Sequence, residues 1–247
     1  MHLRVQIPAY NEAATLAAVT REVTAAAREL LAPSDRLTVL VVDDGSTDST
    51  QAICAQLLTT QAELAVLRNP SRIGLGASFR IGVNDALRSD VDVLAHFDAD
   101  GQFDAAELGA IVRPVRDARF DLVIGTRFLD PLRRPEMPLV RRWGNAGVAW
   151  VVSSLAGRRF TDVSCGFRAF SRRALTTLNL RGDFTYTHES ILQACFAGLA
   201  IDEVAVTAGR RRFGDSRLAS SSLVYGLRAG RIIARTAYSR PRHGGRS

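Results

Sequence analysis

The hydrophobic pattern of the chain alternates between short apolar runs and longer stretches with helical spacing. Short runs rich in Val, Ile and Leu are typical of buried strands, whereas apolar positions three or four apart predict amphipathic helices. The predicted strands span 3–7, 37–42, 64–68, 91–97, 122–126, 167–171 and 201–206. The predicted helices span 12–31, 49–60, 76–87, 105–116, 139–155, 174–178, 187–197 and a tail from 220 onward. This alternation predicts an α/β protein with a mostly parallel, Rossmann-like sheet flanked by helices.

Polar clusters follow the first four predicted strands. They read PAYNE at 8–12, DDGSTD at 43–48, NPSRIGLG at 69–76 and DADGQ at 98–102. Each cluster alone is compatible with ordinary turns and helix caps. Ligands of open α/β sheets, however, bind beyond the carboxyl ends of the strands. Four such clusters at one edge therefore predict a single acidic, glycine-lined site.

The stretch LAHFDADGQFD ends an apolar run with Asp98 and Asp100, one residue apart. On an extended backbone, residues two apart point to the same side, so the two carboxylates would repel one another. Such a pair is tolerable when solvated in a loop and useful when a cation lies between its members. His96, inside the same strand, is expected to be a core histidine with satisfied hydrogen bonds rather than a ligand.

The charge and cysteine content of the chain limit the kinds of partner and compartment that we expect. The chain has 247 residues and a formal charge of +7, and each of its 32 basic residues is Arg. This bias reflects either genomic base composition or an anionic partner, for which guanidinium groups are suited. Three widely spaced cysteines argue against a disulfide framework and a zinc site, and favour a reducing compartment. We expect no signal peptide, and no apolar stretch reaches the roughly 18 residues that a membrane span requires.

The motifs PAYNE, VVDDGSTD, NPSRIGLG and DADGQ, with this spacing, resemble the family 2 glycosyltransferases. The resemblance implies the glycosyltransferase A fold and a nucleotide-sugar donor. In the second half, GTRF at 125–128, RRWGN at 141–145, DVSCGFRAF at 162–170 and RRFGDSRL at 211–218 resemble the dolichyl- and polyprenyl-phosphate sugar synthases of that family. A phosphate-contacting Lys found in many relatives after the third strand is absent here, where Gly74, Leu75 and Gly76 stand.

The resemblance implies roles for individual residues on the donor side. The nucleoside, part of a GDP- or UDP-sugar, is held by Pro8, Tyr10, Glu12, Asp43 and Asp44. A divalent Mg²⁺ or Mn²⁺ ion is held by Asp98, Asp100 and Gln102. Asp98 also serves donor binding, and Asp100 is the firmest ligand. Asp162 and Arg168 lie in the segment that closes the donor pocket; alternatively, Arg168 is buried against a carboxylate as a structural ion pair. A hard cation bound by oxygens suits this chemistry, because the leaving diphosphate gains negative charge.

On the acceptor side the resemblance implies a polyprenyl phosphate. A phosphate monoester is already ionised at neutral pH, since its second pKa is about 6, so arginines that place it replace a general base. The implied acceptor residues are Arg127, Arg141, Asn145, Arg211 and Ser216, of which the three arginines share the catalytic role with Asp100. Arg142 and Arg212 are adjacent alternatives. Glu189 matches an acidic position near the sugar, or is a satisfied helix carboxylate.

We predict a catalytic domain over 1–218, a basic amphipathic helix over 219–239 and a disordered tail over 240–247. The helix would either associate with an anionic membrane surface or pack on the domain or on a second subunit. The expected location is the cytoplasm at the inner face of the membrane, through peripheral contact or a separate membrane subunit.

Two rival hypotheses for the function remain. A family 2 transferase with a hydroxyl acceptor would use Glu189 or Asp162 as its base. A non-catalytic nucleotide- or nucleic-acid-binding module is disfavoured by the acidic edge, and no nucleic-acid partner is expected.

Overall fold

The computed structural model describes residues 1–133, 137, 139–209 and 222–239. Its seven strands form one sheet in the order β3-β2-β1-β4-β6-β5-β7. The strands are β1 (His2–Ala9), β2 (Arg36–Asp43), β3 (Leu64–Arg68), β4 (Val93–His96), β5 (Leu122–Thr126), β6 (Arg168–Ser171) and β7 (Ile201–Ala205). All strands are parallel except β6, which pairs antiparallel with both β4 and β5. The predicted mostly parallel sheet is thereby confirmed.

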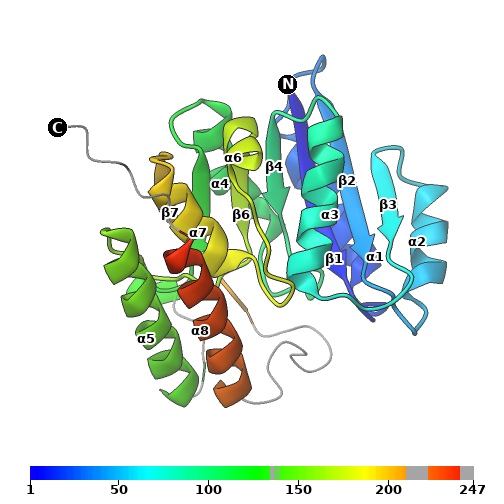
Figure 1. Cartoon of the computed structure of the whole chain (residues 1–247). Helices are drawn as coiled ribbons and strands as arrows, with labels where there is room; N and C mark the ends of the chain where they lie inside the picture. The colour runs from blue at the N-terminus through cyan, green and yellow to red at the C-terminus, as the bar shows by residue number, and fades with distance from the viewer. Residues whose placement is uncertain (134–136, 138, 210–221, 240–247) are drawn as a thin grey trace.

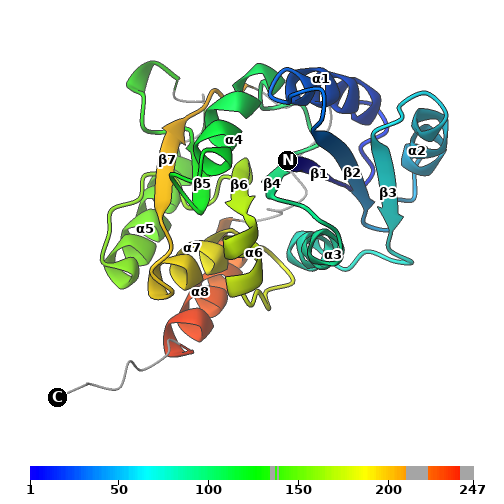
Figure 2. The same ribbon diagram turned by 90° about the horizontal axis from the view of Figure 1, so that it is seen from above.

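Helices cover both faces of the sheet (Figures 1 and 2). One face carries α1 (Leu16–Arg28), α2 (Thr50–Leu58) and α4 (Leu108–Arg116), which follows a short 3-10 turn, η1 (Ala105–Glu107). The other carries α3 (Leu75–Arg88), α5 (Leu139–Ala156), α6 (Arg172–Thr177), α7 (Thr187–Phe196) and α8 (Ser222–Tyr238). A second 3-10 turn, η2 (Pro131–Arg133), precedes α5. Two separate apolar cores result, one on each side of the sheet.

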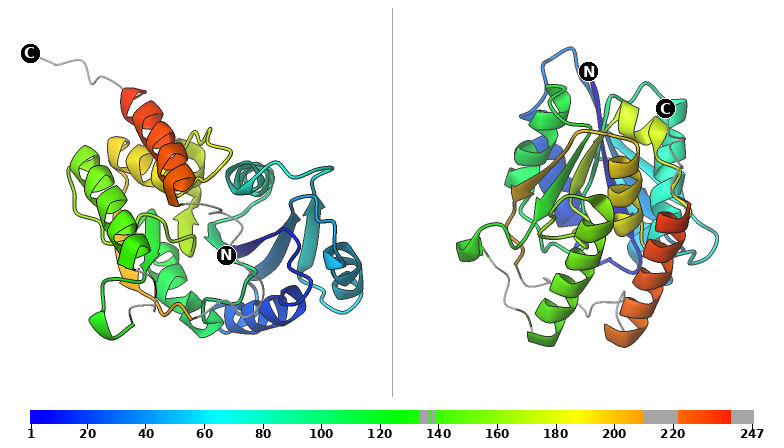
Figure 3. Two further views of the ribbon diagram at one scale, coloured as in Figure 1. Left: turned by 90° about the horizontal axis from the view of Figure 1, so that it is seen from below. Right: turned by 60° about the vertical axis from the view of Figure 1, so that its left-hand side comes forward.

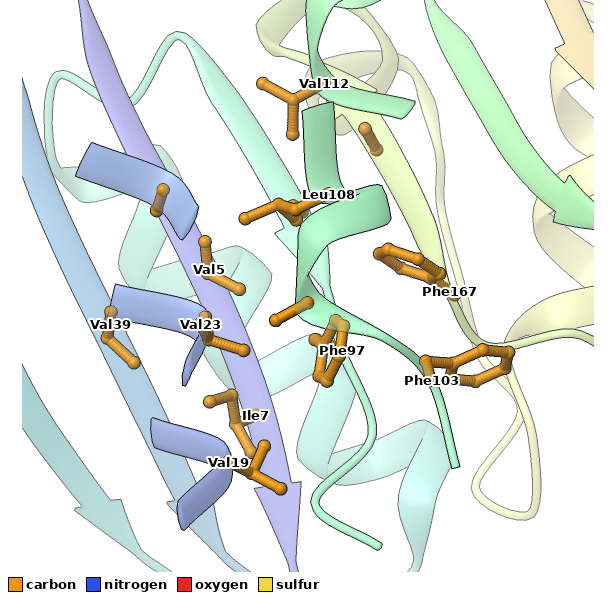
Figure 4. Close-up of a cluster of buried hydrophobic side chains, with 14 of the residues drawn as sticks. Val5, Ile7, Val19, Val23, Val39, Phe97, Phe103, Leu108, Val112 and Phe167 are labelled. Atoms are coloured by element: carbon orange, nitrogen blue, oxygen red, sulfur yellow. The ribbon is translucent and has the colours of Figure 1, made fainter. Parts of the chain in front are cut away.

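The core under α1 and α4 shows how strand alternation builds these layers. Val5 and Ile7 of β1 point to this side and meet Val19 and Val23 of α1 (Figure 4). Phe97, directly after β4, joins them and packs edge-on against Phe167, with ring centroids 5.0 Å apart. Residues of even number on β1 therefore face α3 instead, because side chains alternate along a strand.

The strand order places a topological switch point between β1 and β4. After β1 the chain proceeds outward to β2 and β3, and it then returns to form β4 on the other side of β1. The loops after β1 and β4 consequently lead away from one another at the carboxyl edge. Ligands of open α/β sheets bind in the crevice at such a point, and we use the word crevice below for this region. PAYNE and DADGQ are the two clusters that border this point.

Helices α5 and α8 lie side by side and extend beyond the carboxyl edge of the sheet (Figures 1 and 3). Helix α8 packs on the rest of the domain through Ala229, Ile232, Ile233 and Thr236, all of which are buried. The packing alternative for the C-terminal helix is thus the one that the structure shows. In the described ranges, no helix combines the length and the apolar character needed to span a bilayer.

Helix α4 ends in a strained backbone conformation. Ala118 has φ = 55°, and its N–H donates to the carbonyl of Val115 while the N–H of Arg119 donates to that of Pro114. Glycine is the residue that favours this left-handed position after a helix.

We expect Ala118→Gly to raise the free energy of unfolding by about 0.5–1 kcal/mol, because it removes the steric cost of the left-handed conformation. Urea denaturation measures this gain. Ala110→Gly, at an exposed position inside the same helix, should instead lower stability by a similar amount. Equal destabilisation by both substitutions would contradict the prediction.

Candidate functional site

Asn11 joins the loops that follow β1 and β2. Its side-chain Oδ1 accepts hydrogen bonds from the backbone N–H of Thr47 at 2.7 Å and of Asp48 at 3.3 Å. Its own N–H donates to Ser46 Oγ at 2.9 Å. Asn11 has φ = 54°, a conformation that Asn tolerates better than most residues. Its role was missed in the sequence, although an Asn after a strand is a recognised signal for such local bonding.

The pair Asp43 and Asp44, predicted to hold the nucleoside, is buried and already bonded within the protein. Asp44 accepts from the N–H groups of Ile73 at 3.0 Å and Gly74 at 2.9 Å, and from the side chain of Asn69 at 2.9 Å. It therefore anchors the NPSRIGLG loop. A direct contact between Asp44 and a nucleotide stays a prediction.

Asp43 lies at the end of β2 with both oxygens facing groups of the protein. Its Oδ1 accepts from the N–H of Ser46 at 2.9 Å, while Oδ2 lies 3.5 Å from Nε of Arg68. Only 1% of Asp43 is exposed. The acidic pair thus shapes the loops around the crevice before any ligand enters.

Three other predicted donor residues, Pro8, Tyr10 and Glu12, are half-buried at the carboxyl end of β1. The guanidinium of Arg72, a residue the sequence did not single out, lies 4.3 Å above the ring centre of Tyr10. This cation–π contact connects the loops after β1 and β3. It places an aromatic ring and a positive charge together on one side of the crevice.

The glycines of NPSRIGLG are required by packing between backbones. A Cβ at Gly76 would overlap the carbonyl oxygen of Gly182, and the N–H of Gly76 donates to the carbonyl of Asp183 at 2.9 Å. Gly74, with φ = 98°, would bring a Cβ to 2.7 Å from the same carbonyl of Asp183. These glycines therefore let residues 182–183 lie against the start of α3.

The DADGQ segment turns immediately after β4. The strand ends at His96, and residues 99 and 100 form a turn, so the extended backbone assumed for Asp98 and Asp100 does not continue through both positions. The Oδ1 of Asp100 accepts from the N–H of Gln102 at 3.0 Å, which fixes the turn. Both carboxylates and Gln102 are half-buried at the switch point.

The donor set fits a hard divalent cation. It offers carboxylate oxygens from Asp98 and Asp100 and an amide group from Gln102, whose Nε2 donates to the carbonyl of Gly209 at 3.4 Å. No group of three or more His, Cys, Asp or Glu side chains suited to a metal occurs among the residues that the structure describes. Mg²⁺ and Mn²⁺ need no such group, since one or two carboxylates with waters and substrate phosphates suffice.

Arg127 and Asp162, predicted for the acceptor and the donor respectively, bind one another. Nε of Arg127 donates to Oδ2 of Asp162 at 2.6 Å and Nη2 donates to Oδ1 at 3.0 Å. Burial alone would lower the pKa of Arg127, but the charge and hydrogen bonds of Asp162 outweigh it and hold this pKa above its ordinary value. The guanidinium remains charged beside the crevice, and Asp162 holds it in place.

Arg168 is a fully buried arginine held by carbonyl groups. It donates to the backbone oxygens of Cys165 at 2.7 Å, Thr187 at 2.7 Å and Val163 at 3.0 Å, and to Ser190 Oγ at 2.8 Å. Burial lowers its pKa. The sequence suggested a buried ion pair as one alternative, and in the described part of the chain no carboxylate lies within ion-pair distance of it. Arg168 fastens the DVSCGFR segment to α7.

Glu189 and His188 are structural residues of α7. The carboxylate of Glu189, 2% exposed, accepts from the N–H groups of Arg181 at 3.0 Å and Gly182 at 2.8 Å, and lies 3.5 Å from Nη2 of Arg235. This favours the satisfied-carboxylate alternative. Burial lowers the pKa of His188 to about 3, so its ring is neutral at physiological pH.

The remaining acceptor residues are only partly described. Asn145 is half-buried on α5, and Arg141 belongs to the same helix. Arg211 and Ser216 lie outside the described residues, as does the alternative Arg212. Their assignment to acceptor binding stays a prediction from the sequence.

Comparison with known proteins places this geometry in a family. The description "Glycosyl transferase family 2" matches residues 5–178. The chain is 30% identical over 224 residues to polyprenol monophosphomannose synthase of Mycolicibacterium smegmatis, covering 89% of this chain and 82% of the relative. It is 28% identical to the UDP-N-acetylglucosamine–dolichyl-phosphate N-acetylglucosaminyltransferase of Methanococcus voltae, with 70% of each chain covered.

A solved structure shows the same fold. Glucosyl-3-phosphoglycerate synthase of Mycobacterium tuberculosis, crystallised with Mn²⁺, uridine diphosphate and phosphoglyceric acid, superimposes with a TM-score of 0.70. The likeness covers 98% of this chain and 80% of that one, at 19% identity. The fold expected of a glycosyltransferase A protein is thereby confirmed. Because the family match extends over residues 5–178, more than half of its length, the chain belongs to glycosyl transferase family 2.

Proposed function

We propose that this enzyme transfers a sugar from a nucleotide-sugar donor to a polyprenyl phosphate. An oxygen of the acceptor phosphate attacks the anomeric carbon and forms the new C–O bond. The bond from that carbon to the nucleoside diphosphate breaks, and the diphosphate leaves with the electron pair. Attack from the opposite side inverts the configuration. The names of the relatives from Mycolicibacterium smegmatis and Methanococcus voltae support this acceptor class.

The observation that carries the proposal is that both candidate bases are already hydrogen-bonded to other groups of the protein. Asp162 is engaged by Arg127 and Glu189 by the backbone of residues 181–182. A hydroxyl acceptor would require one of these carboxylates to accept a proton from it. An ionised phosphate needs no base. Arg127 already donates from Nε and Nη2 to Asp162, so an acceptor phosphate would bind the remaining N–H groups of this charged guanidinium. The structure therefore favours the phosphate acceptor over the hydroxyl acceptor.

On the donor side, the half-buried residues Pro8, Tyr10 and Glu12 at the end of β1 would hold the nucleoside. Asp98, Asp100 and Gln102 would hold the Mg²⁺ or Mn²⁺ ion. When bound, this cation neutralises charge that develops on the leaving diphosphate. Other side chains of the protein hold these parts of the site in place: Asp44 fixes the 69–76 loop, and Asp162 fixes the guanidinium of Arg127.

The acceptor side of the proposal includes contact with a membrane surface. The outer face of α5 exposes Leu139, Val140, Trp143 and Trp150, each more than two thirds accessible. Arg142 on the same helix, and Arg228 and Arg231 on the adjoining α8, are exposed. Apolar side chains with Trp and flanking arginines suit the interface of an anionic leaflet. The enzyme would thus work at the inner face of the membrane, where its lipid acceptor lies.

We expect Trp143→Ser and Trp150→Ser each to weaken binding to vesicles of phosphatidylglycerol and phosphatidylcholine about tenfold, because each removes a large side chain from the interface. Co-sedimentation at low salt measures this binding. Leu58→Ser removes an exposed apolar residue of α2 and should leave it unchanged. If neither Trp variant differs from Leu58→Ser, the face serves another partner, such as a membrane subunit.

The function is tested by incubating the protein with Mn²⁺ or Mg²⁺, a panel of GDP- and UDP-sugars, and either a polyprenyl phosphate or the matching polyprenol. We expect release of nucleoside diphosphate that requires both the metal and the phosphate. Turnover with the free alcohol would support the hydroxyl-acceptor rival instead.

The turnover of arginine variants then shows which residues the acceptor phosphate requires. Arg127→Ala and Arg141→Ala should abolish turnover, whereas Arg119→Ala, an exposed arginine at the opposite edge of the sheet, should not change it. Comparing Arg141→Ala with Arg142→Ala decides between the two neighbours. Intact turnover in Arg127→Ala and Arg141→Ala, together with its loss in a folded Glu189→Gln protein, would overturn the phosphate-acceptor proposal.

A further inference from the structure

His96 is completely buried, yet neither of its ring nitrogens has a hydrogen-bond partner among the described residues. The expectation that its hydrogen bonds would be satisfied is therefore wrong. A buried polar group without a partner costs free energy, and one in a native structure requires an explanation. Aromatic packing accounts for the space it fills: its ring centre lies 5.3 Å from that of Phe79 and 5.0 Å from that of Tyr186. Packing alone would be served as well by an apolar residue.

The carboxylate of Asp98 lies beside His96. Its Oδ1 lies 3.6 Å from Nε2 of His96, just beyond hydrogen-bond distance. The two residues are two positions apart where the strand ends, so both lie on the α3 side of the sheet, whereas Phe97 between them points into the core under α1 and α4 (Figure 4). The Asp98 side chain is 31% exposed, so His96 touches the buried side of a carboxylate whose other side meets solvent.

The backbone of Gly166 is a second neighbour that limits the movement of the Asp98 side chain. A Cβ at Gly166 would lie 3.1 Å from Oδ2 and 3.2 Å from Oδ1 of Asp98, so the backbone of Gly166 already lies against this carboxylate. The hydroxyl of Tyr186 donates to the carbonyl of Gly166 at 2.9 Å, and its ring is stacked on Phe79 at 3.7 Å. The buried rings of His96 and Tyr186, together with the backbone of Gly166, thus surround the inner side of Asp98.

We infer that His96 is a positioning residue for Asp98: its Nε2–H donates to Oδ1 and so holds this carboxylate in place for the cation. The inference rests on the proposed role of Asp98 as a metal ligand. Closing the gap to a hydrogen bond requires a shift of only about half an ångström. One carboxylate oxygen is then held from inside the protein, and the other has a defined direction toward the crevice. Such outer contacts orient metal ligands and typically change metal affinity by 10- to 100-fold.

The first test measures Mn²⁺ binding by electron paramagnetic resonance, with Mn²⁺ alone and with UDP or GDP added. His96→Leu places an apolar side chain between Phe79 and Tyr186 but removes both ring nitrogens. It should weaken Mn²⁺ binding at least about tenfold. His96→Gln restores an N–H donor and should recover most of that loss. Phe170→Leu loosens the same cluster, 5.4 Å from Phe79, without touching Asp98, and should leave the affinity unchanged.

The outcomes separate this inference from the proposed function. If the native protein binds no Mn²⁺ with either nucleotide, the metal role of Asp98 fails and the inference fails with it. If the native protein binds Mn²⁺ and folded His96→Leu binds it equally well, only the inference is overturned. Equal losses in His96→Leu, His96→Gln and Phe170→Leu would show a purely structural role and would also overturn it.

A second measurement tests the inference on the native protein, without any substitution. Long-range ¹H–¹⁵N spectra of the four histidines distinguish the two neutral tautomers of each ring. We expect His96 to carry its proton on Nε2, and that proton to shift downfield when Mg²⁺ and a nucleoside diphosphate are added. A ring in the complex whose single proton lies on Nδ1 would overturn the inference, because Nε2 could then donate nothing to Asp98.

Discussion

Arg168→Met should lower the free energy of unfolding by about 3–5 kcal/mol, because the loss of the guanidinium leaves buried acceptors without donors. Three of these are backbone carbonyls, those of Val163, Cys165 and Thr187. Each unsatisfied buried group costs about 1–3 kcal/mol, and methionine fills the space without supplying a donor. Urea denaturation followed by circular dichroism measures the loss.

Arg172→Met is the matched control for this prediction. Arg172 also donates to backbone carbonyls, those of Ser89 and Val91, but it is exposed, so water can replace it. We expect a loss below about 1 kcal/mol there. Arg168→Lys should remain strongly destabilised, since an ammonium cannot reproduce the planar fork of donors. Similar losses at positions 168 and 172 would show that burial of the carbonyl acceptors is not what matters.

Asp100→Asn should reduce turnover with a nucleotide sugar and polyprenyl phosphate at least about 100-fold. The amide preserves the size of the side chain, but it removes the negative charge that a divalent cation requires, and such cations contribute several kcal/mol to stabilising a leaving diphosphate. Steady-state kinetics at varied Mn²⁺ concentration measures the effect, and excess Mn²⁺ should restore only part of the rate.

Asp104→Asn provides the comparison for this substitution. Asp104 is exposed, caps η1 by accepting from the N–H of Ala106 at 2.9 Å, and takes no part in the proposed cation site. Its turnover should stay within about twofold of the native enzyme. Full activity of a folded Asp100→Asn protein would remove Asp100 from the cation site, and a fall in thermal stability common to both variants would show a turn effect instead.

The sequence predicted the elements well because their signals are local. Strands β3 and β5 begin and end where the apolar runs do, and α5 and α7 differ from the prediction by one residue at most. The helix predicted from position 12 begins only at Leu16, because Asn11 adopts a left-handed conformation and its side chain bonds to the next loop. The antiparallel direction of β6 could not be read from its apolar pattern, which is the same for either direction.

The loops that carry the predicted site residues could be located from the sequence, but the hydrogen-bond partners of those residues could not. Asp44 and Asp162 were predicted on the donor side, and Glu189 either near the sugar or as a satisfied helix carboxylate. Each of the three accepts at least one hydrogen bond from a group 8 to 35 positions away. Those pairings depend on how distant loops meet in space, and no local spacing encodes them. Likewise, nothing in the sequence distinguishes a satisfied core histidine from His96, whose ring is enclosed by Phe79 of α3 and by Tyr186 just before α7.

The close approach of Gly76 to Gly182 limits which substitutions this part of the fold accepts. A side chain at Gly76 is excluded by the backbone of Gly182, and a side chain at Gly182 is excluded by the carbonyl of Thr185 and crowded by the carboxylate of Glu189. Glu189 in turn faces Arg235 of α8. One series of contacts therefore connects the start of α3 to α7 and α8. An engineered side chain at Gly76 or Gly182 would need compensating changes across residues 182–189, so these segments are best altered together.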